Sequence, residues 1–216
     1  MKKSFILSLL AGGICYVVLS SNASGYGGNA TGSRGASTGA NGGCSCHGAQ
    51  NNLLPVTVEL DSAGVAVSRY TPGGAYTIKL SGVNNTTSTL PKFGFQLSAV
   101  LANSRQAGTT TPAGQPASVL AGTWGSSLPA GAANVAIGGL NLIRQSSAIN
   151  ATTGTGAAGT TYVISIPWTA PAAGSGAVVL YGVLAAVNAN SSDVGDQTNI
   201  AKTVFIPELG NENTCN

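Results

Sequence analysis

The chain is short of the side chains on which most enzymes depend. Of its 216 residues 7% are charged and 6% aromatic, and it has one histidine, one methionine and four cysteines. A single histidine leaves no base for a Ser-His-Asp triad once that histidine has another use. No Gly-rich segment ends in the Gly-Lys-Ser/Thr that a phosphate loop needs. The protein is therefore not expected to be an enzyme, unless a bound redox cofactor supplies the chemistry.

The beginning of the chain is typical of a secretory signal. Lys2-Lys3 precede an apolar run over 5–19, and Ser21-Asn22-Ala23 then offers a cleavage site. The run is short for a membrane span, and a lipid anchor at Cys15 is disfavoured because Ile14 stands where a small residue is needed. Residues 1–23 therefore predict a removed signal peptide. The mature protein is expected to be secreted, at the cell surface or in the periplasm.

Charge is not only scarce but balanced in the expected mature chain. Removal of the signal takes two of the nine basic side chains, which leaves seven against six acidic ones. This balance provides no electrostatic footprint for nucleic acid or for anionic lipid. Nucleic acid is therefore not an expected partner, and no membrane span is expected after the signal.

Composition divides the remainder into three parts. Residues 24–43 are mostly Gly, Ser, Thr, Ala and Asn, which predicts a Gly/Ser-rich leader with little to bury. Residues 44–207 are expected to form one domain, and 208–216 a C-terminal tail. The low charge, the long leader and an odd number of cysteines after the signal also favour self-association, as in an extracellular filament or surface layer.

Short runs of β-branched and apolar residues, separated by Gly, Pro and Asn, fill the domain. They predict strands at 56–60, 76–80, 93–101, 162–168 and 203–206. Residues 177–187 are long and apolar enough for a helix, but their β-branched residues and Gly182 favour a buried strand. Residues 135–143 are expected to supply one further strand. No convincing amphipathic helix is found, so the pattern predicts an all-β sandwich.

The stretch Gly43-Cys44-Ser45-Cys46-His47-Gly48 holds two of the cysteines and the single histidine. A Cys-x-x-Cys-His run is the attachment signature of a c-type haem, in which two thiols bond the porphyrin and the histidine ligates the iron. This chain reads Cys-x-Cys-His, so Cys46 is in register and Cys44 is not. Either the loop seats both thiols, or Cys46 makes one thioether and Cys44 forms a disulfide, for which Cys215 is the distant candidate.

Two other uses of the same residues remain open. In the first, the cysteines form disulfides and His47 is a polar loop residue, which leaves a haem-free structural subunit. In the second, Cys44, Cys46, His47 and Cys215 form a structural zinc site, although an adjacent Cys and His are cramped as ligands of one ion. We favour one covalent haem per chain, with extracytoplasmic electron transfer as the function.

A haem in this chain would have an unusual sixth iron ligand. The expected mature chain has no methionine and no second histidine, so one copy cannot provide the pairs common in electron-transfer cytochromes. The site would be open or filled by water, or else taken by another group. The candidates are Lys79, Lys92, Lys202, a tyrosine, the new N-terminal amine, or a group from a neighbouring copy.

Two further motifs are weaker. Residues 188–199 gather oxygen donors around Asp193 and Asp196, which could hold calcium, although the EF-hand pattern is missing and an ordinary turn is favoured. Five Asn-x-Ser/Thr sequons in the expected mature chain are expected by chance in so polar a sequence and would lie on the surface if glycosylated. They begin at Asn29, Asn84, Asn85, Asn150 and Asn190.

The order of five segments resembles the bacterial choice-of-anchor V domain, a secreted relative of Reeler-type β-sandwiches. The segments are the Cys-His stretch, 70–77 (YTPGGAYT), 93–97 (FGFQL), 168–171 (WTAP) and Gly195-Asp196. The resemblance implies an immunoglobulin/Reeler-like antiparallel sandwich and suggests haem attachment, because members usually carry Cys-x-x-Cys-His near the domain start. Cys46-His47 matches that pattern and Cys44 departs from it. No apolar tail precedes Asn216, so a C-terminal anchor of the family's kind is not expected.

Overall fold

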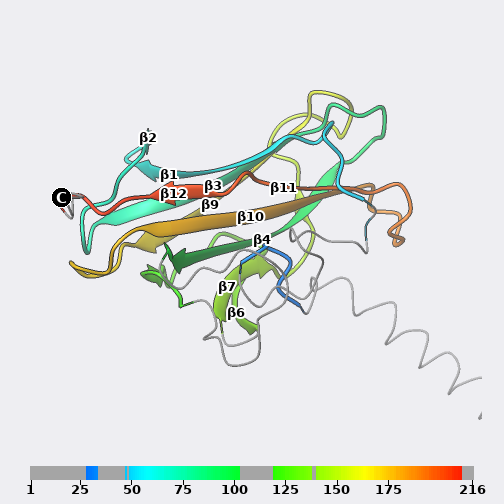
Figure 1. Ribbon diagram of the computed structural model, residues 1–216. Coiled ribbons are helices and arrows are strands. Elements are labelled where there is room, and N and C mark those ends of the chain that lie inside the picture. The colour runs from blue at the N-terminus through cyan, green and yellow to red at the C-terminus, as the bar shows by residue number, and fades with distance from the viewer. Residues whose placement is uncertain (1–27, 34–46, 48, 103–118, 138–139, 211–216) are drawn as a thin grey trace, which may run out of the picture.

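Two antiparallel β-sheets make up the part of the chain that the computed structural model describes, which is residues 28–33, 47, 49–102, 119–137 and 140–210. The sheets pack face to face, with long strands running across the molecule in both (Figure 1). The predicted all-β sandwich is therefore confirmed.

The five-stranded sheet has the order β2-β1-β3-β9-β5. Its strands are β1 (Val56–Ser62), β2 (Val65–Val67), β3 (Ala75–Val83), β5 (Thr123–Trp124) and β9 (Thr161–Thr169). On β1 the side chains alternate between buried and more exposed, with Val56, Val58 and Leu60 facing the core. This period of two is the one that a strand with one buried face requires.

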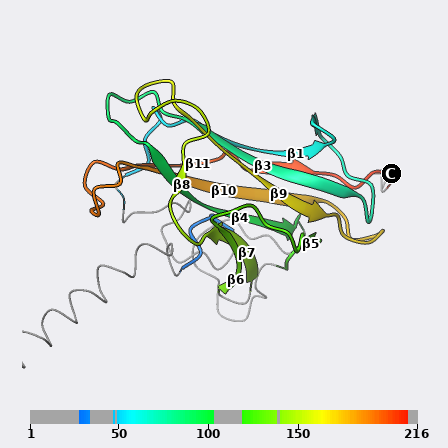
Figure 2. The same cartoon turned by 180° about the vertical axis from the view of Figure 1, so that it is seen from behind.

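The seven-stranded sheet has the order β11-β10-β4-β7-β6, with β12 paired to β10 and β8 paired to β4. Its strands are β4 (Lys92–Leu101), β6 (Ala132–Ile137), β7 (Leu140–Gln145), β8 (Ile149–Asn150), β10 (Val178–Val187), β11 (Gln197–Ile200) and β12 (Val204–Ile206). Seen from behind, β10 and β4 lie side by side through the middle of the sheet (Figure 2). Both are buried along nearly their whole length.

The core lies between the two sheets. It includes Phe95, Leu97, Ile78, Leu80 and Trp168, none more than 2% exposed. Burial of one such side chain contributes roughly 1.5–3 kcal/mol. Gly182 of β10 faces this core, where a Cβ atom would lie 2.4 Å from Leu80 Cδ1. The missing side chain at Gly182 lets β10 approach β3. The glycine that favours a strand over a helix in the sequence therefore also has a packing role.

Most of the strands expected from the sequence are present. The strands predicted at 56–60, 76–80, 93–101, 162–168, 177–187 and 203–206 correspond to β1, β3, β4, β9, β10 and β12. The single strand predicted over 135–143 is wrong, because two antiparallel strands occupy this region, with Ile137 opposite Leu140. A run of apolar residues does not reveal where the chain reverses, since each arm of such a hairpin has the same period.

Part of the Gly/Ser-rich leader packs on the outer face of β4. Ala30 N–H donates to Gln96 Oε1 at 2.7 Å, and Gln96 Nε2 donates to the carbonyl of Gly28 at 2.8 Å. The hydroxyl groups of Thr31 and Ser98 lie 3.0 Å apart. Gln96 and Ser98 are buried polar side chains that need such partners. The leader was expected to have little to bury, and polar complementarity rather than apolar area explains why these residues dock.

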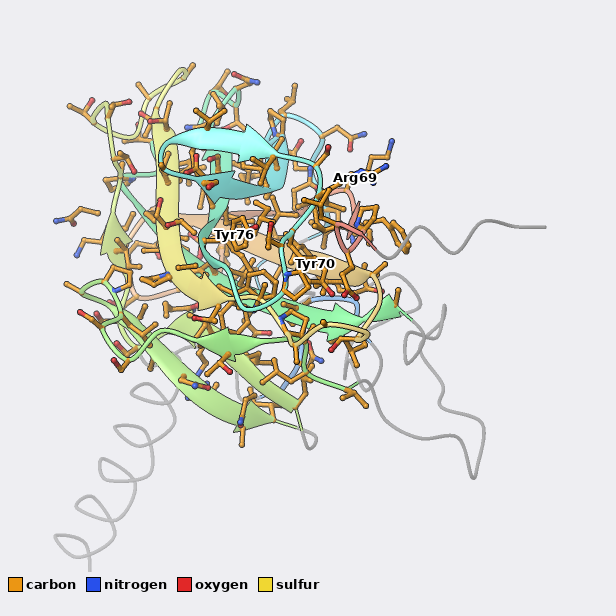
Figure 3. All side chains as sticks on the ribbon, turned by 90° about the vertical axis from the view of Figure 1, so that its left-hand side faces the viewer. Arg69, Tyr70 and Tyr76 are labelled. Carbon is orange, nitrogen blue, oxygen red and sulfur yellow. The ribbon has the colours of Figure 1, made fainter. Side chains whose placement is uncertain are left out.

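Hydrogen bonds fasten the chain around Tyr70, which Figure 3 labels. The buried Glu208 carboxylate accepts the backbone N–H groups of Gly174 and Gly176, each at 2.8 Å. The Tyr70 hydroxyl donates to the Gly176 carbonyl at 2.5 Å. Burial, and then the nearby Glu208 carboxylate, raise the pKa of Tyr70 to about 12. These hydrogen bonds join segments that are far apart in the sequence. They give the buried Tyr70 and Glu208 side chains a structural role.

Candidate functional site

His47 is held at the start of the sandwich by a carboxylate from a distant segment. Its Nδ1 atom lies 2.7 Å from Oδ2 of Asp196, a residue 149 positions further along the chain. The His47 side chain is 31% exposed, whereas that of Asp196 is 2% exposed. The pair therefore joins a carboxylate inside the protein to an imidazole that reaches the surface.

Asp196 is an acceptor with both of its oxygens in use. While Oδ2 faces His47, Oδ1 accepts the backbone N–H of Asn188 at 2.9 Å. A carboxylate buried to this degree needs such bonds, because it has lost most of its hydration. An ionised carboxylate only accepts hydrogen bonds, so the proton of a neutral His47 ring lies on Nδ1. The other ring nitrogen, Nε2, then carries the lone pair that could bind a metal.

The segment that follows His47 is fastened along β11. Gln50 forms a parallel β-bridge with Thr198, and Asn51 N–H donates to the Thr198 carbonyl at 2.8 Å. Asn51 Nδ2 also donates to Gln197 Oε1 at 2.5 Å. Since β11 begins at Gln197, directly after Asp196, these bonds bring His47 beside the carboxylate. The site is thus built by pairing an N-terminal segment with an edge strand.

The loop that carries Asp196 is shaped by a series of side-chain-to-backbone bonds. Asn188 Oδ1 accepts from the N–H of Asn190, whose Oδ1 accepts from the N–H of Ser192. The Nδ2 group of Asn188 closes the loop by donating to the Val194 carbonyl at 2.9 Å. Asn and Ser favour such turns because their short polar side chains reach the backbone two residues on. The loop joins β10 to β11 and lies at the end of both strands (Figure 1).

The cysteines of the predicted site, Cys44 and Cys46, lie outside the described residues, as does Cys215. Cys46 directly precedes His47 in the sequence, so a thiol and the imidazole are neighbours along the chain. Among the residues that the structure describes, no group of three or more His, Cys, Asp or Glu side chains could hold a metal ion. The zinc alternative needs all three cysteines and stays a prediction.

The two carboxylates of the acidic loop lie in different surroundings. Asp193 is exposed, and Asp196 is buried with its oxygens directed at His47 and the backbone of Asn188. The calcium site suggested at these two residues stays a prediction. The sequence did point to Asp196, but no local signal connects it to a histidine 149 residues away.

The lysines considered as a sixth iron ligand lie in separate places. Lys79 of β3 donates to Glu59 Oε1 at 2.7 Å, and this partner raises its pKa. Lys92 begins β4, on the same sheet as the site, and Lys202 is an exposed residue between β11 and β12. The ion pair makes Lys79 the least available of the three.

Burial separates the five sequons into two groups. Asn29 and Asn84 are 1% and 0% exposed, and their side chains bond to neighbouring residues. A glycan could not be accommodated at either position in this fold. Asn85, Asn150 and Asn190 are exposed.

Comparison with known proteins finds likeness only among solved structures. No protein-family model matches the chain, and no curated protein matches it. The reeler domain of human F-spondin covers 74% of this chain and 91% of its own length, at 18% identity and a TM-score of 0.44. Another structure, the Reelin-N domain of F-spondin, gives 17% identity over 74% of this chain and 88% of its own, with a TM-score of 0.41.

A third structure, AvmM, is described as catalysing macrocyclization in alchivemycin A biosynthesis. It shares 8% identity over 73% of this chain and 88% of its own, with a TM-score of 0.35. At these values the likenesses support no statement about function, and the sandwich rests on the strand order itself. Within the described ranges, no helix has the length and apolar character needed to cross a membrane.

Proposed function

We propose that this protein carries one covalently attached c-type haem and transfers electrons outside the cytoplasm. Cys46, with or without Cys44, would bond the porphyrin, and His47 would ligate the iron through Nε2. The observation that supports this most is the bond between His47 Nδ1 and the buried Asp196 carboxylate. Histidines that bind metals almost always donate their other ring N–H to a carboxylate, a carbonyl or water.

The residues at the site fit such a group chemically. The order Cys46-His47 supplies a thiol next to an imidazole, as the attachment signature requires. Because Asp196 occupies Nδ1, the lone pair of Nε2 is left for a metal. A bound haem would supply one-electron redox chemistry. The chain's own residues would bind it, orient the imidazole and shield the Asp196 carboxylate from water.

The decisive experiment is haem staining on a denaturing gel, with a pyridine haemochrome spectrum of protein purified from its native source. Covalent haem is expected to remain with the 216-residue chain, less its signal, after denaturation. The α-peak is expected at the position for one thioether. Absence of haem colour from the purified protein would overturn the proposal. The haem-free structural subunit, with disulfides through Cys215, would then be the better account.

Self-association has separate support from β6, an edge strand of the seven-stranded sheet. Its six residues, Ala132–Ile137, contain no charge and no proline, and Asn134 and Ala136 are exposed. Charges and prolines at sheet edges normally prevent pairing with other chains. The other strands that pair on one side only, β2, β5, β8, β11 and β12, have two to four residues. We therefore propose that β6 pairs antiparallel with β6 of a second copy, which adds no like charges across the two-fold axis.

The β6 proposal predicts that Ala136→Lys makes the protein monomeric. With Val135 on the two-fold axis, the two lysines would lie diagonally across the paired strands on the same face, within reach of each other, and like charges so placed are destabilising. Sedimentation velocity under reducing conditions should show a dimer for the unaltered protein and a monomer for the variant. Mixing Ala136→Lys with Ala136→Glu should restore the dimer. Thr57→Lys, which adds the same charge at an exposed position of the other sheet, should stay dimeric. A monomeric unaltered protein would refute the pairing.

A further inference from the structure

The Asp196 carboxylate has a role beyond holding a loop. We propose that Asp196 is a positioning residue that presents Nε2 of His47 to the haem iron and lowers the reduction potential of the bound haem. This inference rests on the proposed function, since it concerns the same histidine. Asp196 would not touch the haem and would act only through the imidazole, with its Oδ2 atom 2.7 Å from Nδ1.

The first step of the argument is the choice of tautomer. A neutral imidazole carries its proton on either nitrogen, and the partner of one nitrogen decides which. The ionised Asp196 carboxylate can only accept, so it retains the proton on Nδ1. If His47 had no such partner, its ring could rotate or exchange tautomers. With Asp196 in place, Nε2 is the nitrogen available for coordination, and the ring direction is held.

The second step is the rigidity of Asp196 itself. Its side chain is 2% exposed, and its Oδ1 atom is held by the N–H of Asn188. The loop between these two residues includes Ala189 and Ser191 with φ values of 60° and 66°. Residues other than glycine adopt this left-handed conformation at a cost, and such positions persist only where the surroundings enforce them. Here the hydrogen bonds of the Asn188 and Asn190 side chains hold the loop in this conformation. The Asp196 carboxylate therefore has a fixed orientation.

The third step is the effect of charge. A carboxylate partner makes an imidazole a stronger electron donor than a neutral partner does, and second-shell hydrogen bonding is one of the ways a protein sets a haem potential. Asp196 is buried, so water screens its charge less than that of an exposed residue. A negative charge beside the axial ligand stabilises the oxidised iron, which has the larger positive charge. The expected consequence is a lower reduction potential.

The test compares two substitutions in the same loop. Asp196→Asn removes the buried charge and keeps the shape, whereas Asp193→Asn removes an exposed charge three residues away. Changes in second-shell partners typically alter metal affinity about 10–100-fold. At a fixed solution potential, the ratio of reduced to oxidised haem should rise several-fold in Asp196→Asn and change little in Asp193→Asn. Spectroelectrochemical titration of the full, haem-loaded chain measures this ratio.

A second measurement does not depend on haem. Because the chain has one histidine, ¹⁵N labelling gives one pair of ring signals without any need for assignment. In protein produced without haem, His47 should show the Nδ1–H tautomer, and Asp196→Asn should shift the tautomer ratio. Asp193→Asn should not. Circular dichroism of both variants verifies that the sandwich is folded.

The outcomes separate the inference from the proposed function. If haem is attached and both variants have the potential of the unaltered protein, the inference is overturned and the haem proposal stands. If no haem attaches to the unaltered protein, the proposed function fails, and the tuning role of Asp196 fails with it. A potential that rises only in Asp196→Asn, together with the tautomer shift, supports the inference.

Discussion

Replacing Cys46 by serine is expected to abolish covalent haem attachment completely. Cys46 directly precedes His47 and therefore occupies the second thioether position of the attachment signature. Serine cannot form a thioether, so haem should leave the chain on denaturation even if His47 still ligates the iron. Haem staining after denaturing electrophoresis measures the loss, with total protein on the same gel as the reference.

Cys44→Ser is the matched control for Cys46→Ser. The two cysteines are separated by one residue, but Cys44 is out of register with the signature. If Cys46 alone bonds the porphyrin, Cys44→Ser should retain the stain and leave the α-peak of the haemochrome unchanged. A shift of the α-peak in Cys44→Ser would show instead that the loop seats both thiols. Equal staining of both variants and the unaltered protein would contradict the assignment of Cys46.

Gly122→Ala is expected to be among the most destabilising single substitutions in the sandwich. Gly122 has a φ of 71°, and a Cβ atom there would lie 2.2 Å from the carbonyl oxygen of Thr169 and 2.7 Å from Cε2 of Trp168. The left-handed conformation alone costs alanine about 1–2 kcal/mol. Trp168 is 2% exposed and its Nε1 donates to the Ala121 carbonyl, so neither neighbour can move without breaking a bond or opening the core.

The control for Gly122→Ala is Gly73→Ala. Gly73 has a φ of 69°, but a Cβ atom there would have no neighbour within 4 Å. Both substitutions therefore place an alanine in the left-handed conformation. Only Gly122→Ala also brings a Cβ atom into collision with neighbouring atoms. The free energy of unfolding from urea denaturation should fall by about 1–3 kcal/mol more for Gly122→Ala. Similar losses of unfolding free energy in the two variants would mean that the segment around Gly122 shifts at little cost to accommodate the Cβ atom.

Prediction from the sequence succeeded where one side of a strand meets the core. Alternation in 56–60 and 76–80 identified β1 and β3, and the β-branched residues around Gly182 correctly favoured strand over helix for β10. It failed at 135–143, where apolar residues continue through a reversal of the chain. The four-residue β11 was missed as well. Its residues Gln197–Ile200 are polar for the most part, and pairing with β10 rather than propensity makes them a strand.

The candidate site, like the fold, could be predicted from the sequence only in part. The sequence singled out His47 and its cysteine neighbours because the haem-attachment signature that they resemble is a pattern of adjacent residues. It also singled out Asp196, but as one of two carboxylates in a loop. What it could not show is the contact between them, because β11 joins the N-terminal segment only when the chain has folded. The same holds for Gln96, which binds the leader 66 residues before it.

The sequence by itself determined the class of fold, the main strands and the Cys-x-Cys-His stretch that holds the single histidine. Each of these is a local property, set by residue type and by spacing over a few positions. Only the tertiary structure decided which strand lies beside which, where Gly122 is needed and which carboxylate faces His47. Those depend on contacts between residues far apart in the chain, and many arrangements of strands share the same local pattern. The pairing of β11 with β10 and with residues 50–51 selects the arrangement that places Asp196 beside His47.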